Sequence, residues 1–292
     1  MIIVKIFGGL GNQLYQYAAA KYLAEKHKVP IRLDLSAFDS DKLRNFDLQK
    51  FNTKFAIASK EDIANLLPRN NIAKALQYLR PKEKRTYHRE RGLHFDNTFS
   101  SIGPNVYLKG YFQSERYFLP IEQIIRAEFA LDRSYTLQVE DIATNMRNEP
   151  SVSVHIRRGD YTDPEVLRIH GVLQKDYYQK AITMAKQAIP NARFYFFSDD
   201  AGWVKENFDL TNSVIVSGQH TTSHVEDFYL MSQCRNNIIA NSSFSWWCAW
   251  LNDNSEKLVV APASWFAARP DDSADRIPDS WKQIASPLAQ KL

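Results

Sequence analysis

The sequence predicts an α/β protein made of two halves, each built around a parallel sheet. The chain opens with an apolar run, a glycine-rich turn, a segment of helical periodicity and a second apolar run. After Pro150, short apolar runs and helical segments alternate, which is typical of parallel sheets. Its 292 residues, 44% of them hydrophobic, suffice for two domains of ordinary size, which we expect at residues 1–145 and 146–292.

The first half is regular only at its start. A helix follows the glycine-rich turn, because apolar residues recur there at helical spacing, at Leu14, Tyr17, Ala18, Tyr22 and Leu23. Beyond this opening the pattern becomes irregular as far as residue 131. The expected elements of this half are strands at residues 2–6, 29–35 and 105–112 and helices at residues 14–28 and 59–67.

The second half shows the clearer alternation. Its apolar runs are short enough for buried strands, and the longer periodic segments between them read as helices. The expected strands are residues 151–156, 193–197, 214–216, 237–240 and 258–261, and the expected helices are residues 176–189 and 226–234 with a further one in NSSFSWWCAWL.

Composition and charge exclude several classes of protein. The net charge of +4 permits an anionic ligand but is far from the signature of a nucleic-acid-binding protein. Cys234 and Cys248 form neither a disulfide framework nor a zinc pattern, and no run approaches about 18 apolar residues. The amino terminus does not resemble a signal peptide. We expect a cytoplasmic protein whose basic run, residues 82–91, is a solvated face or a contact with an anionic membrane surface at its inner face.

Polar clusters follow four of the predicted strands, at the edge where open α/β sheets bind ligands. The first, GGLGNQ (residues 8–13), resembles a dinucleotide-binding turn, but Leu14 stands where the third glycine is expected. It is either a tight turn between strand and helix or an anion site at a helix amino terminus. In the second case, Asn12 and Gln13 add side-chain donors.

The second cluster, HIRRGDY (residues 155–161), places two adjacent arginines after a strand. Arginine offers bidentate donors that match phosphate. Because side chains alternate along a strand, Arg157 and Arg158 leave it on opposite sides. We therefore expect one to bind a phosphate and the other to pair with a carboxylate such as Asp160. His155 lies within the strand. It is either a neutral residue of the core or part of the ligand-binding site.

The remaining clusters each have two interpretations. The carboxylates of FSDD, Asp199 and Asp200, either accept hydrogen bonds from a ribose or guanine edge or cap the next helix. The hydroxyls of ANSSFSWW, from Ser242, Ser243 and Ser245, either cap a helix or bind a phosphate. Trp246, Trp247 and Trp250 have helical spacing and are expected to pack in the core.

Metal-binding and hydrolase motifs are weak. Asp39 and Asp41 match D-x-D in a polar loop, where chance explains the match. His220 and His224 lie four residues apart, but the glutamate of an H-E-x-x-H motif is absent, and there is no G-x-S-x-G sequence. We expect no metal ion and no other cofactor.

The chain as a whole resembles the α-1,2-fucosyltransferases of glycosyltransferase family 11, in their bacterial form. The segments that carry the resemblance are FGGLGNQLYQYAAA, LKGYFQSERYF, HIRRGDY, DYYQKAI, FYFFSDD, DFYLMSQCRNNIIANSSFSWWCAWLN and APASWF. Their combination is specific and spans nearly the full length. The resemblance implies a GT-B-like fold of two Rossmann-type lobes with a cleft between them. It also implies inverting, metal-independent transfer of L-fucose from GDP-fucose to the 2-hydroxyl of a terminal galactose.

The resemblance also implies roles for individual residues. Arg157 contacts the diphosphate, Asn12 reaches toward the transferred sugar, and Tyr111 and Gln113 belong to the acceptor side. The donor-binding residues that it implies are Gly9, Gly11, Asn12, Gln13, His155, Arg157, Arg158, Ser198, Asp199, Asp200, Asn241, Ser242, Ser243 and Phe244.

Chemistry leaves the catalytic base open. The negative charge that grows on a departing diphosphate needs stabilisation, which arginine and helix N–H groups provide as catalytic donors. The acceptor hydroxyl must lose its proton to a base. The candidates for this base are Asp160, Asp163 and His170, which lie on or just after the loop that begins with Arg157 and Arg158, called here the arginine loop.

Two rival functions remain at the level of sequence. One is a transferase for another nucleotide sugar, and the other is a non-catalytic α/β module that binds nucleotide or nucleic acid. A dinucleotide oxidoreductase would rest on the incomplete glycine turn alone. The expected partners are GDP-fucose and a galactose-terminated or lipid-linked glycan.

Overall fold

The computed structural model describes residues 1–292 except 42, 93, 160–162, 269–274 and 291–292. It divides into two compact units, Met1–Ala130 and Leu131–Leu292, called here the N-terminal and C-terminal units. The division comes earlier than the predicted boundary after residue 145. The reason is that helix α5 (Glu140–Asn148) packs against α9 (His224–Gln233) of the C-terminal unit. There the Tyr229 hydroxyl donates to Glu140 Oε2 over 2.6 Å.

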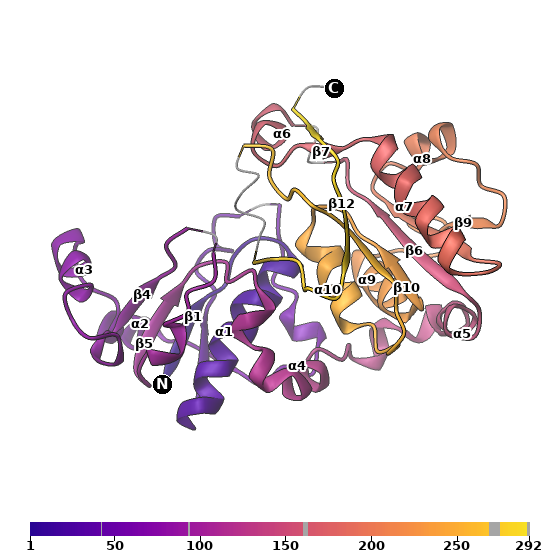
Figure 1. Ribbon diagram of the computed structural model, residues 1–292. Coiled ribbons are helices and arrows are strands. Elements are labelled where there is room, and N and C mark those ends of the chain that lie inside the picture. Colours follow the sequence, from indigo (N-terminus) through magenta and orange to yellow (C-terminus); the bar gives the residue numbers. More distant parts are fainter. Residues whose placement is uncertain (42, 93, 160–162, 269–274, 291–292) are drawn as a thin grey trace. The chain divides into compact units, whose positions relative to one another are not determined.

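The N-terminal unit contains a parallel five-stranded sheet in the order β3-β2-β1-β5-β4 (Figure 1). Its strands are β1 (Ile2–Lys5), β2 (Ile31–Asp34), β3 (Ala56–Ile57), β4 (Tyr87–Arg89) and β5 (Val106–Lys109). Its helices are α1 (Leu10–His27), α2 (Lys60–Leu66), α3 (Asn71–Gln77) and α4 (Glu122–Glu128).

Helix α1 is buried on nearly every side, which its apolar and small residues allow. Lys28 ends it in the left-handed conformation, and its N–H donates to the carbonyls of Ala24 and Glu25. Within the unit, the Tyr17 hydroxyl donates to Glu128 Oε2 over 2.6 Å and Lys21 Nζ lies 2.8 Å from Glu128 Oε1. These contacts hold α1 against α4.

The C-terminal unit contains a parallel six-stranded sheet in the order β12-β11-β10-β6-β8-β9. Its strands are β6 (Ser151–Ile156), β8 (Arg193–Ser198), β9 (Ser213–Ile215), β10 (Asn236–Ile238), β11 (Val259–Pro262) and β12 (Lys282–Ile284), with β7 (Val172–Leu173) and β13 (Leu288–Ala289) forming a separate antiparallel pair. Besides α5 and α9, its helices are α6 (Pro164–His170), α7 (Lys175–Ala188), α8 (Ala201–Asn207) and α10 (Ser243–Leu251).

Short 3-10 helices occupy several connections. Their bounds are Leu48–Lys50, Lys82–Lys84, Phe99–Ser101, Glu115–Tyr117, Leu119–Ile121, Arg133–Tyr135 and Leu137–Val139. Among the described helices, none combines the length and apolar character needed to cross a membrane.

Helix α7 covers one face of the second sheet. Tyr177, Tyr178 and Ala181 are buried there against apolar residues of β6 and β8. The Tyr177 hydroxyl donates to the Ile239 carbonyl over 2.6 Å, so the one polar atom of this buried ring is satisfied.

The order of the strands locates the place where a ligand is expected. From β6 the chain adds β8 and β9 on one side, and then β10, β11 and β12 on the other. Connections that diverge from adjacent parallel strands leave a crevice at their carboxyl ends. In this unit, that point lies where β6 and β10 end, beside the end of β8.

All the predicted strands and helices are present, with ends that differ by a few residues. The prediction of a solvated face at residues 82–91 is wrong for its centre, because Tyr87 and His88 are buried in β4. The short elements β3, β7, β12, β13, α3, α6 and α8 carried no sequence signal that we recognised.

Candidate functional site

The ends of β6 and β8 bring two arginines and two aspartates together. Ile156 is in register with Ser198, so the residues that follow them are neighbours. Arg157 Nη1 lies 3.0 Å from Asp199 Oδ2, and the backbone N–H of Arg158 donates to Asp199 Oδ1 over 2.9 Å. Arg158 Nε lies 3.4 Å from Asp200 Oδ2. A single carboxylate, Asp199, therefore fixes the backbone and one side chain of the arginine pair.

Asp160, the expected partner of an arginine, lies outside the described residues, so that pairing stays a prediction. Among the described residues, Asp199 and Asp200 pair with the arginines. Asp200 also accepts a hydrogen bond from the Trp203 N–H over 2.9 Å, so the capping alternative holds for it. The carboxylates thus hold the two arginines, and the expected contact with ribose or guanine stays a prediction.

Arg158 is held more firmly than its position in sequence suggests. Its guanidinium carbon lies 4.4 Å from the centre of the Trp203 ring, in addition to the contact with Asp200. The Arg157 side chain, by comparison, is 26% exposed and accessible to a ligand. Arg158 is thus the more enclosed of the two guanidiniums, and Arg157 is the more exposed one.

Gly159 is required by the same arrangement. A Cβ atom at this position would lie 2.6 Å from Asp199 Oδ2, well inside van der Waals contact. A side chain here would displace the carboxylate that holds Arg157. Sequence reasoning missed this role, and the signal was the glycine that directly follows the two arginines.

His155 is buried beside the arginine pair. It is 7% exposed, its ring centre lies 5.7 Å from that of Phe244, and among the described residues Nδ1 has no hydrogen-bond partner. Burial, followed by the positive charge of Arg157, lowers the pKa of His155 to about 3. The imidazole is thus neutral at physiological pH.

This depressed pKa predicts acid sensitivity of the C-terminal unit. The unfolded state takes up a proton below the ordinary histidine pKa of about 6.5, whereas the folded state resists it until about pH 3. Stability therefore falls as the pH falls through this window. Relative to His155→Gln, the wild type should lose about 2 kcal/mol more of its unfolding free energy between pH 7 and pH 5.

Urea unfolding followed by tryptophan fluorescence measures this loss. All 6 tryptophans belong to the C-terminal unit, so the signal reports on that unit alone. His220→Gln, which removes an exposed histidine of the same unit, is the matched control and should keep the wild-type pH profile. Identical pH profiles for His155→Gln and the wild type would contradict a neutral, buried His155.

The amino terminus of α10 lies at the third strand end. Its N-cap residue, Ser242, makes no side-chain capping hydrogen bond, and its first turn has no acidic residue. The capping interpretation is therefore wrong for Ser242. Phe244 packs between His155 and Phe228, with ring centres 5.7 and 5.4 Å away. Backbone N–H groups at the start of a helix favour an anion.

Asn241 shapes the backbone around this helix. Its buried Nδ2 donates to the carbonyls of His170, Gly171 and Trp265 over 3.1 to 3.3 Å. The side chain therefore joins the end of α6 to the segment after β11. This role differs from the expected contact with the donor.

The two described candidates for a catalytic base have structural contacts. Asp163 caps α6, since its Oδ1 accepts from the N–H groups of Glu165 and Val166 over 3.0 and 3.4 Å. The ring of His170 packs against Phe266, with centres 5.3 Å apart. Neither contact selects a base.

Ser198 belongs to a hydrogen-bonded chain that the sequence did not indicate. Its Oγ accepts from the Asp200 N–H over 3.0 Å, and its own N–H donates to Ser217 Oγ over 3.1 Å. Ser217 and Thr221 in turn donate to Asp227, over 2.8 and 2.6 Å. Burial raises the pKa of Asp227, and these hydroxyls counter that effect. These hydrogen bonds fix the turn that follows β8.

Predicted residues also meet in the N-terminal unit, at the ends of β1 and β5. Gln113 Nε2 donates to Asn12 Oδ1 over 2.6 Å. Tyr111 is 41% exposed, and its ring edge lies against Phe7 with centres 5.0 Å apart. Gly8 has φ of +78°, so the turn before Asn12 requires glycine.

The other residues of this turn serve the fold. Gln13 is fully buried, and its Nε2 donates to the carbonyls of Gly8 and Asn45 while its Oε1 accepts from the Asp47 N–H. It therefore does not face a ligand, contrary to the prediction. Gly9 is the N-cap of α1 and Gly11 is buried in its first turn.

No metal-binding constellation is present within the described part of the chain. There, no group of three or more histidine, cysteine, aspartate or glutamate side chains could hold a metal ion.

Comparison with known proteins gives matches over nearly the whole chain. The family model described as glycosyl transferase family 11 matches residues 1–285. An alpha-1,2-colitosyltransferase of Escherichia coli is 33% identical over 291 residues, which cover 97% of this chain and 99% of that protein. The O-antigen biosynthesis glycosyltransferase WbnK of Escherichia coli is 33% identical over 295 residues, with 94% and 97% covered.

More distant relatives match in part. The galactoside 2-alpha-L-fucosyltransferase SEC1 of Bos taurus is 30% identical over 200 residues, covering 64% of this chain and 54% of that one. Among solved structures, a mutant of FUT1 from Arabidopsis thaliana in complex with GDP has a TM-score of 0.52 at 13% identity, covering 88% of this chain and 69% of that one. This likeness concerns the fold, which is GT-B-like as predicted.

Proposed function

Because the chain belongs to glycosyltransferase family 11, we propose that it transfers L-fucose from GDP-fucose to the 2-hydroxyl of a terminal galactose, with inversion and without a metal ion. The observation that carries this proposal is the arginine loop, in which Asp199 holds Arg157 at the ends of β6 and β8. The start of α10, where the Ser242 side chain makes no capping hydrogen bond, lies at the neighbouring strand end. Both features supply fixed donors to a diphosphate.

The reaction breaks the bond between the anomeric carbon and the phosphate oxygen, whose electron pair leaves with GDP. A new bond forms between that carbon and the galactose 2-oxygen, and the proton of the hydroxyl passes to a base. Arg157 would stabilise the charge that grows on the diphosphate, because its guanidinium is already positioned. The neighbouring His155 packs against Phe244 and would support the site by packing.

The nucleotide is proposed as GDP on two grounds. The fold is shared with the plant protein whose structure contains GDP, and galactoside fucosyltransferases are among the relatives. In the N-terminal unit, Asn12, Tyr111 and Gln113 would contact the transferred sugar and the acceptor.

A second candidate differs in the sugar. The bacterial relative that is 33% identical over nearly the full length is named for transfer of colitose, which is L-fucose without its 3-hydroxyl. The same diphosphate chemistry would serve both donors. The competing donor is therefore GDP-colitose, and discrimination would depend on contacts to one hydroxyl.

The proposed location is the cytoplasm, and the acceptor is a galactose-terminated glycan of a surface polysaccharide. Cys234 and Cys248 are buried and unlinked, which suits a reducing compartment. A relative in O-antigen biosynthesis supports the choice of acceptor class.

Mass spectrometry of donor and acceptor panels tests the proposal. We expect GDP-fucose with a β-galactose-terminated glycan to yield one added deoxyhexose in the presence of EDTA, and linkage analysis to place it at the 2-position. The matched control is the same glycan ending in 2-deoxygalactose, which should give no product. Faster transfer from GDP-colitose would replace the first candidate by the second, and failure with every GDP-sugar would contradict both.

A further inference from the structure

The surface around α3 of the N-terminal unit is apolar and basic at the same time. Ile72, Leu76 and Leu79 are 73%, 53% and 80% exposed, and we call them the apolar ridge. Ile72 and Leu76 are four residues apart, so they lie on the same face of the helix. The Leu79 N–H donates to the Leu76 carbonyl over 3.2 Å, which continues the turn.

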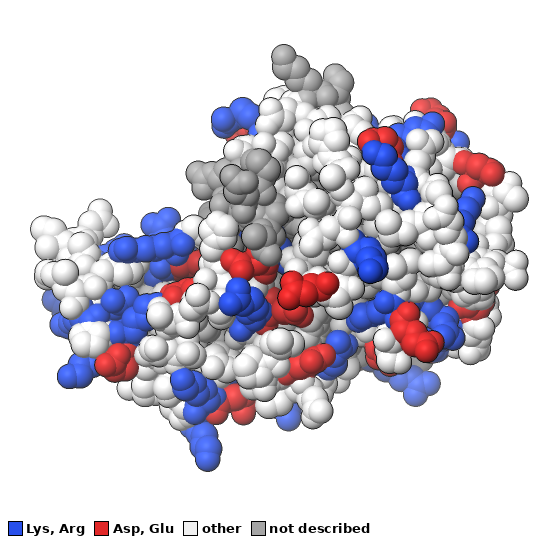
Figure 2. Space-filling view, in the orientation of Figure 1, with Lys and Arg blue, Asp and Glu red and all other residues white. Residues whose placement is uncertain are grey.

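Basic side chains surround the apolar ridge. Residues 69–91 contain eight lysines and arginines against two glutamates, a larger excess than the +4 of the entire chain. The exposed ones are Arg69, Arg80, Lys84, Arg89 and Arg91. Figure 2 shows blue side chains beside white atoms at the far left, where Figure 1 draws α3.

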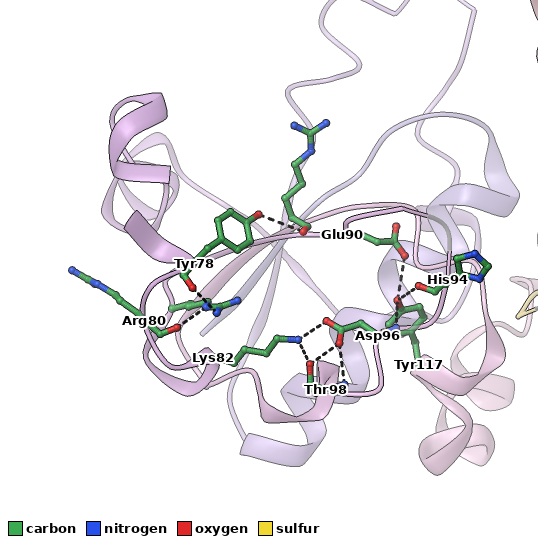
Figure 3. A network of polar contacts seen from close by, with 10 residues as sticks. Tyr78, Arg80, Lys82, Glu90, His94, Asp96, Thr98 and Tyr117 are labelled. Atoms are coloured by element: carbon green, nitrogen blue, oxygen red, sulfur yellow. Dashed lines mark hydrogen bonds and ion pairs between the residues drawn. The ribbon is translucent and has the colours of Figure 1, made fainter. Parts of the chain in front are cut away.

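Several of these cations are held in place by the fold. The guanidinium carbons of Arg91 and Arg85 lie 3.7 and 5.4 Å from the centre of the Tyr78 ring. Arg85 Nη2 also donates to the Tyr78 carbonyl over 3.1 Å. Lys82 instead turns to Asp96, 2.5 Å away, while the Arg80 side chain points away from the other residues drawn in Figure 3.

A second group of cations continues this surface along the sheet. Val4 pairs with Leu108 and Arg89 pairs with Lys109, so Lys5, Lys109 and Arg89 lie side by side at the ends of β1, β5 and β4. Burial first, and then the charges of Lys5, Arg89 and Lys74, lower the pKa of Lys109. Among the described residues, neither Lys74, Arg89 nor Lys109 forms an ion pair.

Because the cations outnumber the carboxylates in this segment by eight to two, they repel one another on balance, and an anionic partner would relieve that repulsion. We propose that the apolar ridge and the surrounding basic residues dock this protein on the surface of an anionic lipid membrane. The apolar side chains enter the headgroup layer while the cations meet lipid phosphates. A second copy of the chain fits less well, because it would bring the same positive surface against itself.

The docking surface reaches the acceptor side of the proposed function. Lys109 is two residues before Tyr111 and four before Gln113, at the end of the same strand. A lipid-linked acceptor would therefore meet these residues from the membrane. This step rests on the proposed function, whereas the docking itself does not.

Flotation with vesicles tests the docking. We expect the protein to float with vesicles of phosphatidylcholine and phosphatidylglycerol, to bind pure phosphatidylcholine weakly, and to lose binding at high salt. Replacing Arg80, Lys84 and Arg89 together by glutamine should lower partition to anionic vesicles about a hundredfold. Ile72→Ser with Leu76→Ser should lower it at least about tenfold.

Matched controls come from exposed residues elsewhere. The triple change to glutamine of Lys180, Lys186 and Lys205 in the C-terminal unit removes the same charge, and Leu43→Ser with Leu137→Ser removes similar apolar surface. Both controls should bind like the wild type. Transfer to a soluble acceptor should be unchanged in every variant, which separates docking from catalysis.

Three results would overturn the docking. The first is equal partition of the charge variant and its control, which would mean that net charge alone attracts the protein. The second is absence of binding to anionic vesicles at low salt. The third is a dimer in sedimentation analysis that Ile72→Ser with Leu76→Ser dissolves while vesicle binding is absent.

Discussion

Replacing Arg157 with alanine lowers kcat for transfer by about two to three orders of magnitude, as expected for loss of one preorganised donor to a developing negative charge. The guanidinium lies 3.0 Å from Asp199, which aims it before the donor arrives. A residue that only bound the ground state would instead raise KM at constant kcat. Steady-state kinetics with varied donor separate the two cases.

The fold should tolerate this change. The Arg157–Asp199 pair is about one quarter exposed, and such partly solvated pairs contribute on the order of 1 kcal/mol or less. Asp199 also keeps the hydrogen bond from the Arg158 N–H. Arg193→Ala, which removes an arginine paired with Glu149 at the opposite end of β8, is the matched control and should retain activity. Equal activity of the two variants would show that Arg157 has no role in transfer.

Replacing Trp246 with alanine destabilises the C-terminal unit by about 3–5 kcal/mol, the usual cost of emptying a fully buried tryptophan site. Its ring contacts Trp247 and Trp281, with centres 5.1 and 5.4 Å apart. Its Nε1 donates to the Arg276 carbonyl over 2.7 Å. Urea unfolding followed by circular dichroism gives the free energy without depending on the removed fluorophore.

Trp246→Phe is the milder change at the same site. It keeps an aromatic ring there and loses the bond to Arg276 with part of the indole volume, so about 1–2 kcal/mol should be lost, less than for alanine. If both variants lost less than about 1 kcal/mol, α10 would not be anchored by this residue, and the fixed position of its amino terminus would need another cause.

The regular parts of the fold were predictable because their patterns are local. Helical periodicity predicts α1, and apolar runs predict the strands β6 and β8. The positions of the strand ends follow from these runs. The division between the units was placed too late, because the packing of α5 against α9 is a contact between residues far apart in sequence.

The sequence predicted which strand ends form the candidate site. It predicted less well which side chains contact each other there. The pattern alone predicted a pairing of one arginine with Asp160, close by in sequence, and did not predict that Asp199 reaches Arg157 from the neighbouring strand. In the sequence, Gln13 and Asn241 look like amides that bind a ligand. In the structure, their side-chain N–H groups donate hydrogen bonds to backbone carbonyls. Only three-dimensional contacts distinguish a polar side chain that faces a ligand from one that braces a loop.

Calorimetry of nucleotide binding in EDTA tests the central claim most directly, that fixed arginine and backbone donors hold the diphosphate of a GDP-sugar. The account predicts that GDP binds the wild type without metal, that guanosine binds at least about a hundredfold more weakly, and that Arg157→Ala removes most of that difference. Equal affinities of GDP and guanosine for the wild type, or GDP binding that requires a divalent cation, would contradict it.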